Sequence, residues 1–306
     1  MKKLLKKLPG ALRGRDIWRR FSHAVQYSDQ AFYEYVAPGH FYSPLPDAGW
    51  VRSHAKQIFD QSPTSFPGIN LNVERQLEVL AEMGALHEGL DFSETRKDGS
   101  RFYYQNPNFG YGDVAILHGM MRRLNPSHIV EVGSGFSSAA MLDIADNHLL
   151  DLEFTFVEPY ATLLKSLLSD SDRQRVSIIE QPVQHVGPEV FSKLGENDIL
   201  FIDSSHVLKT GSDLHHLLLH VVPTLAPGVV IHFHDVFWPF EYPETWVMNG
   251  RAWNEIYALH AFLLFNKAFE IEYFNHYIGV HHRQALQERM PICLKNPGGG
   301  LWLKRV

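Results

Sequence analysis

Short apolar runs alternate with stretches of helical periodicity in the second half of the chain. Runs rich in β-branched and aromatic residues suit strands buried on both faces of a sheet. The stretches between them place apolar residues every three to four positions, as amphipathic helices do. The alternation predicts an α/β fold with a parallel sheet and right-handed crossovers. The predicted strands are 129–132, 154–157, 176–179, 198–202 and 229–233.

The end of the chain has a different pattern. A helix over 254–265 leads to a strand over 269–274. A loop region with a short helix over 283–289 follows, and a final strand covers 301–304. The end therefore adds two strands that do not continue the simple alternation.

An extension precedes the predicted sheet. Apolar spacing predicts a helix over 71–86 with Asn72 as its cap, and a short strand over 102–104. A turn-rich stretch at 106–113 then leads into another helix. The expected division is an N-terminal extension, 1–105, and a main domain, 106–306.

A glycine turn follows the first predicted strand. The motif Glu131-x-Gly133-x-Gly135 places two glycines where the chain must turn sharply and where a ligand can approach the backbone. Ser137 is expected to cap the helix that follows. A strand, a glycine turn and a helix start suit a nucleotide-like ligand. An ordinary strand–turn–helix corner has the same pattern.

An acid after the second strand supports the ligand interpretation. Glu158 lies 25 residues after Gly133, near the spacing of about 20 at which a carboxylate binds a ribose. The third glycine of the dinucleotide fingerprint is missing. The pattern therefore disfavours a nicotinamide-dependent oxidoreductase.

This combination of glycine turn and acid resembles motif I and the ribose-binding acid of class I S-adenosylmethionine-dependent methyltransferases. The resemblance covers about residues 106–306. It implies a Rossmann-like, seven-stranded, mostly parallel sheet whose last strand inserts antiparallel between the fifth and sixth, and S-adenosylmethionine as cofactor. The residues that it places at the cofactor are Glu131, Gly133, Ser134, Gly135, Glu158, Gln181 and Asp203.

Acidic and imidazole side chains follow two further strands. Asp203 and His206 come after the fourth predicted strand, and His234 and Asp235 end the fifth. Ligands in open α/β sheets bind outside the carboxyl ends of strands, so we expect these side chains to converge. Close carboxylates repel unless a cation lies between them, which predicts a divalent metal held by Asp203 and Asp235. Helix caps and polar core histidines are the alternative. We leave His232 out because we place it off the face of His234.

A more specific resemblance rests on two stretches, Phe201-Ile-Asp203-Ser-Ser-His206 and Pro227-Gly-Val-Val-Ile-His-Phe-His234-Asp235. They resemble the methyltransferase branch that includes macrocin-type sugar O-methyltransferases and cephalosporin-hydroxylase-like proteins. The resemblance implies Asp203 and His206 as catalytic residues, with His206 as base. It also implies magnesium bound by Asp203 and the pair His234-Asp235. An acid is usual where His234 stands, and imidazole favours manganese, iron or zinc over magnesium.

The resemblance implies an enzyme that methylates a hydroxyl on a sugar or a natural-product-like acceptor, either a small molecule or a glycan. We expect the aromatic run 237–253 to border the acceptor site. The alternative is an accessory protein of the same fold that binds the cofactor without catalysis. The acid–base set favours the enzyme, since a binding module has no need of it.

Composition and charge narrow the setting. The single cysteine, Cys293, excludes a disulfide framework and a thiolate zinc site. A protein without disulfides fits a reducing compartment, so we expect a cytoplasmic protein. Residues 1–20 hold eight Lys/Arg and one acid, a net charge of +7, so the rest carries −13 of the total of −6. This acidic body argues against nucleic acid as substrate. The basic start suits either peripheral contact with the inner face of a membrane or a frayed, solvated helix.

Overall fold

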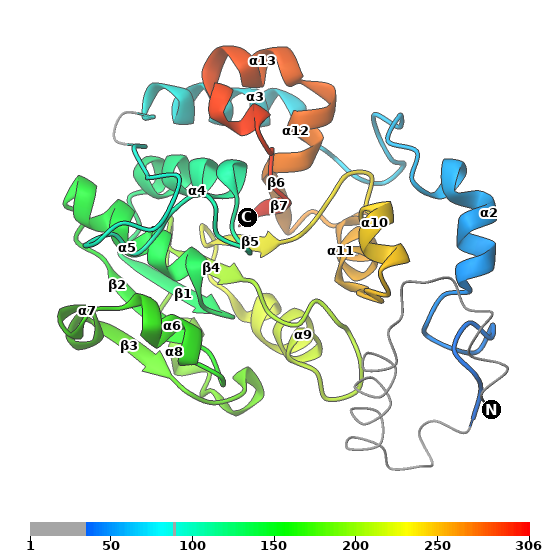
Figure 1. Ribbon diagram of the computed structural model, residues 1–306, viewed down its shortest axis with the longest axis horizontal. Coiled ribbons are helices and arrows are strands. Elements are labelled where there is room, and N and C mark those ends of the chain that lie inside the picture. Colours follow the sequence, from blue (N-terminus) through cyan, green and yellow to red (C-terminus); the bar gives the residue numbers. More distant parts are fainter. Residues whose placement is uncertain (1–34, 88–89) are drawn as a thin grey trace, which may run out of the picture. The chain divides into compact units, whose positions relative to one another are not determined.

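A seven-stranded β-sheet forms the centre of the protein, whose computed structural model describes residues 35–87 and 90–306 (Figure 1). The strand order is β3-β2-β1-β4-β5-β7-β6, with β7 antiparallel to both neighbours and the pairs from β3 to β5 parallel. This confirms the expected sheet with its seventh strand between the fifth and sixth. The strands are β1 (His128–Val132), β2 (Glu153–Val157), β3 (Val176–Ile179), β4 (Ile199–Ile202), β5 (Val230–His234), β6 (Phe269–Phe274) and β7 (Gly300–Arg305).

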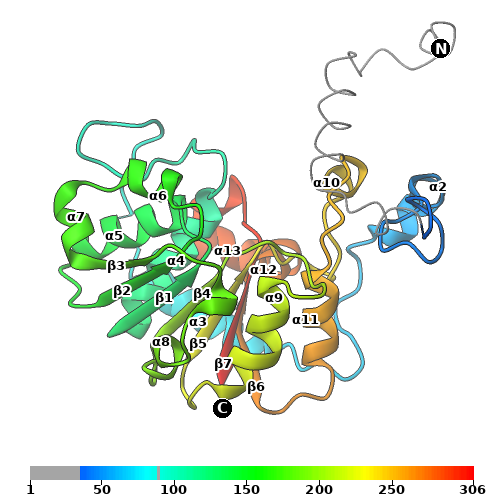
Figure 2. The same cartoon turned by 90° about the horizontal axis from the view of Figure 1, so that it is seen from below.

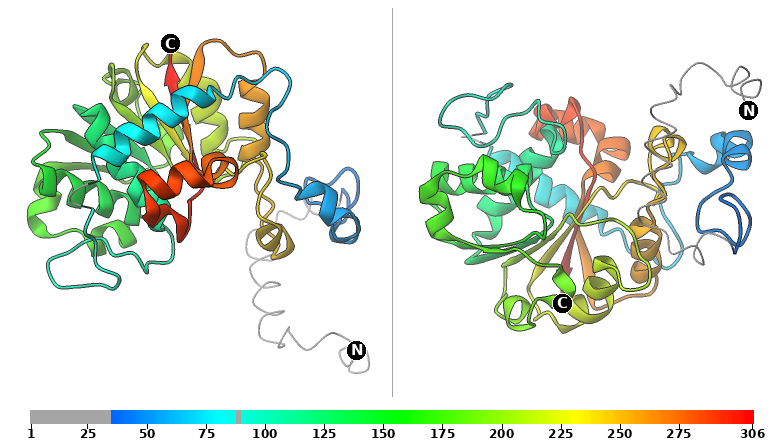
Figure 3. Two further views of the ribbon diagram at one scale, coloured as in Figure 1. Left: turned by 90° about the horizontal axis from the view of Figure 1, so that it is seen from above. Right: turned by 60° about the horizontal axis from the view of Figure 1, so that its bottom comes forward.

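Helices cover both faces of the sheet (Figures 2 and 3). One group contains α3, α4, α5, α12 and α13, which pack on one another, and α9 and α11 lie on the other face. The helices of the sheet region are α3 (Val73–Ala85), α4 (Tyr111–Leu124), α5 (Phe136–His148), α6 (Thr162–Leu167), α7 (Asp170–Arg175), α8 (Glu189–Ser192), α9 (Asp213–His216), α10 (Glu244–Met248), α11 (Glu255–Leu263), α12 (Asn275–His281) and α13 (Arg283–Arg289).

The described part of the chain divides into two units at residue 55, with residues 35–55 in the smaller one and 56–306 in the larger. The larger unit contains the sheet together with α3 and the loop after it. Helix α2 (Ala48–Ile58) begins in the smaller unit, and most of its side chains are exposed. The functional division expected at residue 105 stays a prediction. The basic segment 1–20 lies outside the described residues, and no helix within the described ranges has the length and apolar character to cross a bilayer.

The central strands are buried because helices cover both of their faces. All four residues of β4 and all five of β5 are buried, as the continuous apolar runs predicted. Register pairs Val132 with Ile202 and Ile202 with Phe233. The carboxyl ends of β1, β4 and β5 therefore meet at one edge of the sheet.

Three local predictions were wrong. Residues 102–104 form no strand, and Phe102 and Tyr104 instead pack edge-on against Phe92 in a loop. Ser137 lies inside α5 rather than at its cap, because Gly135 takes the cap position. The region expected to be mainly loop before α13 contains a further helix, α12. Asn72 does precede α3, but its side chain makes no cap hydrogen bond.

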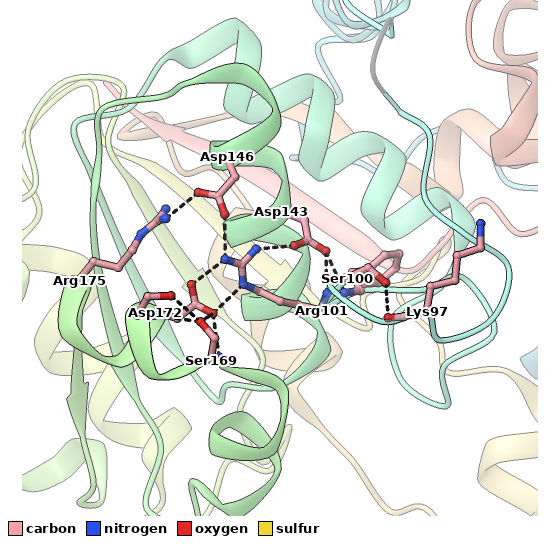
Figure 4. Close-up of polar contacts among 10 residues, drawn as sticks. Lys97, Ser100, Arg101, Asp143, Asp146, Ser169, Asp172 and Arg175 are labelled. Atoms are coloured by element: carbon pink, nitrogen blue, oxygen red, sulfur yellow. Dashed lines mark hydrogen bonds and ion pairs between the residues drawn. The ribbon is translucent and has the colours of Figure 1, made fainter.

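A half-buried arginine, Arg101, joins the loop before α4 to helices α5 and α7 (Figure 4). The guanidinium of Arg101 donates to Asp143 Oδ1 at 2.6 Å and to both carboxylate oxygens of Asp172, at 2.6 and 2.8 Å, and it pairs with Asp146 at 2.8 Å. Hydrogen bonds from Arg101 outweigh burial and hold the pKa of Asp172 well below its usual range. The loop is thereby fixed against α5 and α7.

Arg101→Ala should lower the free energy of unfolding by about 3 kcal/mol, because it leaves the buried Asp172 carboxylate without its cation. The measurement is urea denaturation followed by circular dichroism. Arg175→Ala is the matched control, since Arg175 is 44% exposed and pairs with Asp146 at 2.6 Å. Its expected loss is below about 1 kcal/mol. Equal losses of stability in the two variants would contradict the proposed role of Arg101 in fixing the loop.

Candidate active site

The glycine turn after β1 packs against the end of β4. Gly133 has a φ of 84°, and a Cβ built there would lie 1.8 Å from the carbonyl oxygen of Asp203. The Gly133 N–H donates to Val157 O at 3.0 Å, which joins the turn to the end of β2. Both the backbone conformation and the close approach therefore require glycine.

Glu131 lies beneath this turn. Its buried carboxylate accepts hydrogen bonds from Ser137 Oγ at 2.5 Å and from Ser138 Oγ. Burial raises the pKa of Glu131 to about 8. Glu131 thus fixes the start of α5 and does not itself line the spaces described next.

The β1–β2 cleft is a cavity of about 460 Å³ at the carboxyl edge. At its rim the Glu158 carboxylate accepts from Tyr160 N at 2.7 Å and from Ser134 N at 3.2 Å. Gln181 lies next to lining residue Pro182 but does not line the cleft, and its amide donates to His185 O at 3.3 Å. The lining residues are Val132, Gly133, Val157–Tyr160, Pro182–Gln184, Asp203–Ser205, Lys209 and Gly211–Asp213.

A second cavity of about 430 Å³, the strand-end pocket, continues from the cleft. The hydroxyls of Ser134 and Ser204 are buried there without a hydrogen-bond partner among the described residues. The two cavities share Gly133, Glu158, Asp203, Ser204 and Ser205. The strand-end pocket adds Asn108, Ser134, Gly135, Ser137, Leu163, His206, His234, Asp235 and Trp253.

The four side chains expected to converge lie together in the strand-end pocket. His206 Nε2 lies 3.4 Å from Asp203 Oδ1 and 3.8 Å from Asp235 Oδ2. The other ring nitrogen, Nδ1, lies 2.8 Å from Glu255 Oε2 at the start of α11. Each nitrogen faces carboxylate oxygens, an arrangement that favours the doubly protonated imidazolium.

These contacts set opposite pKa shifts for the two aspartates. Burial disfavours the ionised form of Asp203, but His234 and His206 outweigh it and lower its pKa. Burial dominates at Asp235 and raises its pKa to about 6. Burial opposes the charge of His206, yet Asp203 and Glu255 outweigh it and raise its pKa to about 10. Neighbouring acids with separated pKa values are typical of catalytic sites.

Backbone strain is concentrated in the same place. His206 and Asp235 have φ values of 57° and 55°, in the left-handed region that costs about 1–2 kcal/mol for residues with a Cβ. The carbonyl of His206 accepts from Asn254 N at 3.1 Å and from Glu255 N at 3.2 Å, and Asp235 N donates to Gly299 O at 2.7 Å. These contacts hold the strained residues in position, as expected at a functional site.

The exclusion of His232 from the face of His234 was wrong. Residues two apart on a strand share a face, and His232 Nε2 lies 3.4 Å from His234 Nδ1. Both rings are buried, and His232 stacks on Phe201 with centroids 4.1 Å apart. His232 nevertheless does not line the strand-end pocket, so it supports His234 from the core.

A third cavity, the aromatic pocket of about 340 Å³, adjoins the strand-end pocket. The two share Asn108, Asp235 and Trp253. Part of the aromatic run 237–253 forms its wall, namely Phe237, Trp246 and Trp253, while Trp238 and Phe240 are buried in the core. Asp235 therefore lies between two cavities.

Sequence reasoning missed Glu255. The apolar periodicity identified α11 only as a helix, in which an acid at the first turn has an ordinary role beside the helix dipole. In the structure, Glu255 is 1% exposed and its partner is His206, 49 residues earlier in the chain. A buried contact of this separation leaves no periodic signal in one sequence.

Comparison with known proteins identifies a methyltransferase domain over residues 130–236. An uncharacterized protein of Archaeoglobus fulgidus is 34% identical over 168 residues, covering 53% of this chain and 75% of that protein. A putative caffeoyl-CoA O-methyltransferase from Staphylococcus aureus has 14% identity and a TM-score of 0.42, with 84% of this chain and 97% of that chain covered. CmcI with Mg and SAM has 15% identity and a TM-score of 0.41, with 72% and 95% covered. Neither of these two structures is similar enough to decide a function.

Proposed function

Because the chain belongs to the class I S-adenosylmethionine-dependent methyltransferase family, we propose that it transfers a methyl group from S-adenosylmethionine to a hydroxyl of a small-molecule or glycan acceptor. A sugar or a natural-product-like ring is the acceptor class that the proposal names. The observation that carries it is the run of three adjoining cavities with Asp235 between the last two.

The side chains present fit the cofactor. Glu158 stands at the rim of the cleft, where its carboxylate can accept the ribose hydroxyls, and residues 182–184 line the end next to it. The partnerless hydroxyls of Ser134 and Ser204 and the half-buried Asp203 can bind the amino-acid portion in the strand-end pocket. Bound S-adenosylmethionine supplies an electrophilic methyl group. Gln181 stays a proposed neighbour of the adenine.

The side chains fit the expected magnesium or manganese less well. Within residues 35–87 and 90–306 no group of three or more His, Cys, Asp or Glu is placed to hold a metal ion. His206 Nε2 lies between Asp203 and Asp235, where a bridging cation would have to bind. The His234 Nε2 atom lies 3.7 Å from Asp235 Oδ1 and stays buried. The proposed reaction therefore uses no metal, and the ligand set Asp203, His234 and Asp235 stays a prediction.

The proton of the acceptor needs a base in the strand-end pocket. The sequence-based expectation gives this role to His206. A protonated His206 between two carboxylates cannot accept a proton, whereas Asp235, with its pKa raised to about 6 by burial, is ionised near neutral pH. We propose that Asp235 accepts the hydroxyl proton as the oxygen bonds to the methyl carbon and the carbon–sulfur bond breaks. His206 then positions Asp235 and Asp203.

Isothermal titration calorimetry with S-adenosylmethionine and with NAD tests the cofactor assignment. S-adenosylmethionine should bind and NAD should not. Glu158→Ala should weaken S-adenosylmethionine by about 1.5–3 kcal/mol, the range for a hydrogen bond to a charged group. Glu180→Ala is the control, since Glu180 is exposed and pairs with Lys165 outside the cleft. Binding of NAD alone, or an unchanged affinity in Glu158→Ala, would refute the assignment.

The pH profile of kcat distinguishes the two bases. With Asp235 as base, kcat should fall about tenfold per pH unit below about 6, where Asp235 becomes protonated. It should fall again above about 10, where His206 loses the proton that holds the two carboxylates. With neutral His206 as base, kcat would instead keep rising about tenfold per unit up to about pH 10.

Asp235→Asn should lower kcat by about 10²–10⁴ with little change in cofactor affinity. Glu241→Gln is the matched control, because burial also raises the pKa of Glu241 but its partner is Tyr257, outside the strand-end pocket. If kcat rises up to pH 10 and the Asp235→Asn variant stays active, a group other than Asp235 accepts the proton of the acceptor hydroxyl.

A further inference from the structure

The aromatic pocket contains a cationic side chain that makes no ion pair with the described part of the chain. Arg251 lines this pocket from the loop between α10 and α11. Its guanidinium carbon lies 4.0 Å from the ring centroid of Trp246 and 5.0 Å from that of Trp253. The two indoles stand at 84° with centroids 5.5 Å apart. Cation–π contacts with both rings therefore restrict the guanidinium to one corner of the pocket.

Within residues 35–87 and 90–306 no carboxylate lies within 4.0 Å of the exposed Arg251 side chain, and its guanidinium donates no hydrogen bond to another of these residues. The backbone N–H of Arg251 donates to Trp246 O at 3.1 Å. The two acids that line the same pocket have other functions. Asp113 accepts from Gly110 N at 3.0 Å and Gly299 N at 3.1 Å, and Asp235 faces His206. The guanidinium thus keeps its N–H donors available to a ligand.

The position of this cation relative to Asp235 limits the ligand. Asp235 and Arg251 both line the aromatic pocket, and Trp253, whose ring centroid lies 5.0 Å from the Arg251 guanidinium, also borders the strand-end pocket. A ligand in the aromatic pocket can therefore contact both charged side chains. An anionic group is attracted by Arg251 and repelled by Asp235, so it is expected next to Arg251, with a hydroxyl elsewhere on the same ring facing Asp235.

The charge count favours a carboxylate over a phosphate. Arg251 is one positive charge near two acids, so it balances a singly charged group better than a doubly charged one. A planar guanidinium also binds a carboxylate with two parallel hydrogen bonds. The aromatic side chains of Phe237, Trp246 and Trp253 in the pocket wall offer apolar surface for the ring itself.

We propose that the acceptor is a hydroxylated ring that carries a carboxylate, of the uronic acid class, with Arg251 binding the carboxylate and Asp235 facing the hydroxyl. The proposal rests on the proposed function, since it names the acceptor of the same site. It assigns Arg251, Trp246 and Trp253 to acceptor specificity.

Saturation-transfer difference NMR with the protein saturated with S-adenosylhomocysteine tests this. The probes are methyl β-D-glucuronide and methyl β-D-glucoside, which differ only in the carboxylate, and glucose 6-phosphate. The glucuronide should bind at least about tenfold more tightly than the glucoside, as expected for one charge-assisted pair, and more tightly than the phosphate.

Arg251→Gln should remove this preference, so that the glucuronide binds no more tightly than the glucoside. Arg251→Lys should retain part of the preference for the glucuronide, because lysine keeps the positive charge but cannot bind the carboxylate with two parallel hydrogen bonds. Arg283→Gln, on α13 away from the pocket, is the control and should bind as the unchanged protein does. Equal or absent binding of the two glycosides, tighter binding of the phosphate, or a glucuronide affinity that survives Arg251→Gln would overturn the proposal.

Calorimetry of S-adenosylhomocysteine on the same samples separates the two claims. If S-adenosylhomocysteine fails to bind while glucuronide selectivity depends on Arg251, the methyltransferase assignment fails and the carboxylate site stands. If S-adenosylhomocysteine binds and the selectivity is missing, only the acceptor class is wrong.

Discussion

Two carboxylates at the ends of adjacent buried strands set the main electrostatic constraint on this fold. Asp203 and Asp235 follow β4 and β5, and pairing of these strands in register brings the two residues together. Charges that close must be balanced by a cation or a proton. His206, held from behind by Glu255, supplies the balance and leaves Asp235 the weaker acid of the two.

The sheet topology makes this arrangement possible. β7 pairs with β5, and Gly299, just before β7, makes hydrogen bonds to two acids of the site. Gly299 O accepts from Asp235 N, and Gly299 N donates to the carboxylate of Asp113. In the segment after β5, Glu255 binds His206 Nδ1 and Trp253 packs against the His206 ring. The antiparallel end of the sheet therefore supports the site as well as completing the core.

Much of the fold was predictable because its signals are local. The strands are short apolar runs, and all seven begin and end within one residue of their predicted bounds. The glycine turn and the acids after β4 and β5 were found because the carboxyl ends of parallel strands share one edge.

The remaining features depend on contacts between distant residues. Glu255 reads as an ordinary helix acid until it meets His206. The sequence gives no sign that the exposed side chain of Arg251 lies over Trp246 and Trp253, five and two residues away along an irregular loop. Phe102 and Tyr104 were assigned to a strand from their apolar spacing, but in the structure both rings contact Phe92 from a loop. The error over His232 was different, because strand periodicity alone places it on the face of His234.

The most direct test of the account is a crystal structure of the protein with S-adenosylhomocysteine. The account expects both ribose hydroxyls within hydrogen-bond distance of Glu158 and the sulfur facing the strand-end pocket, toward Asp235. A ligand bound away from Glu158, or one whose sulfur points away from Asp235, would contradict it.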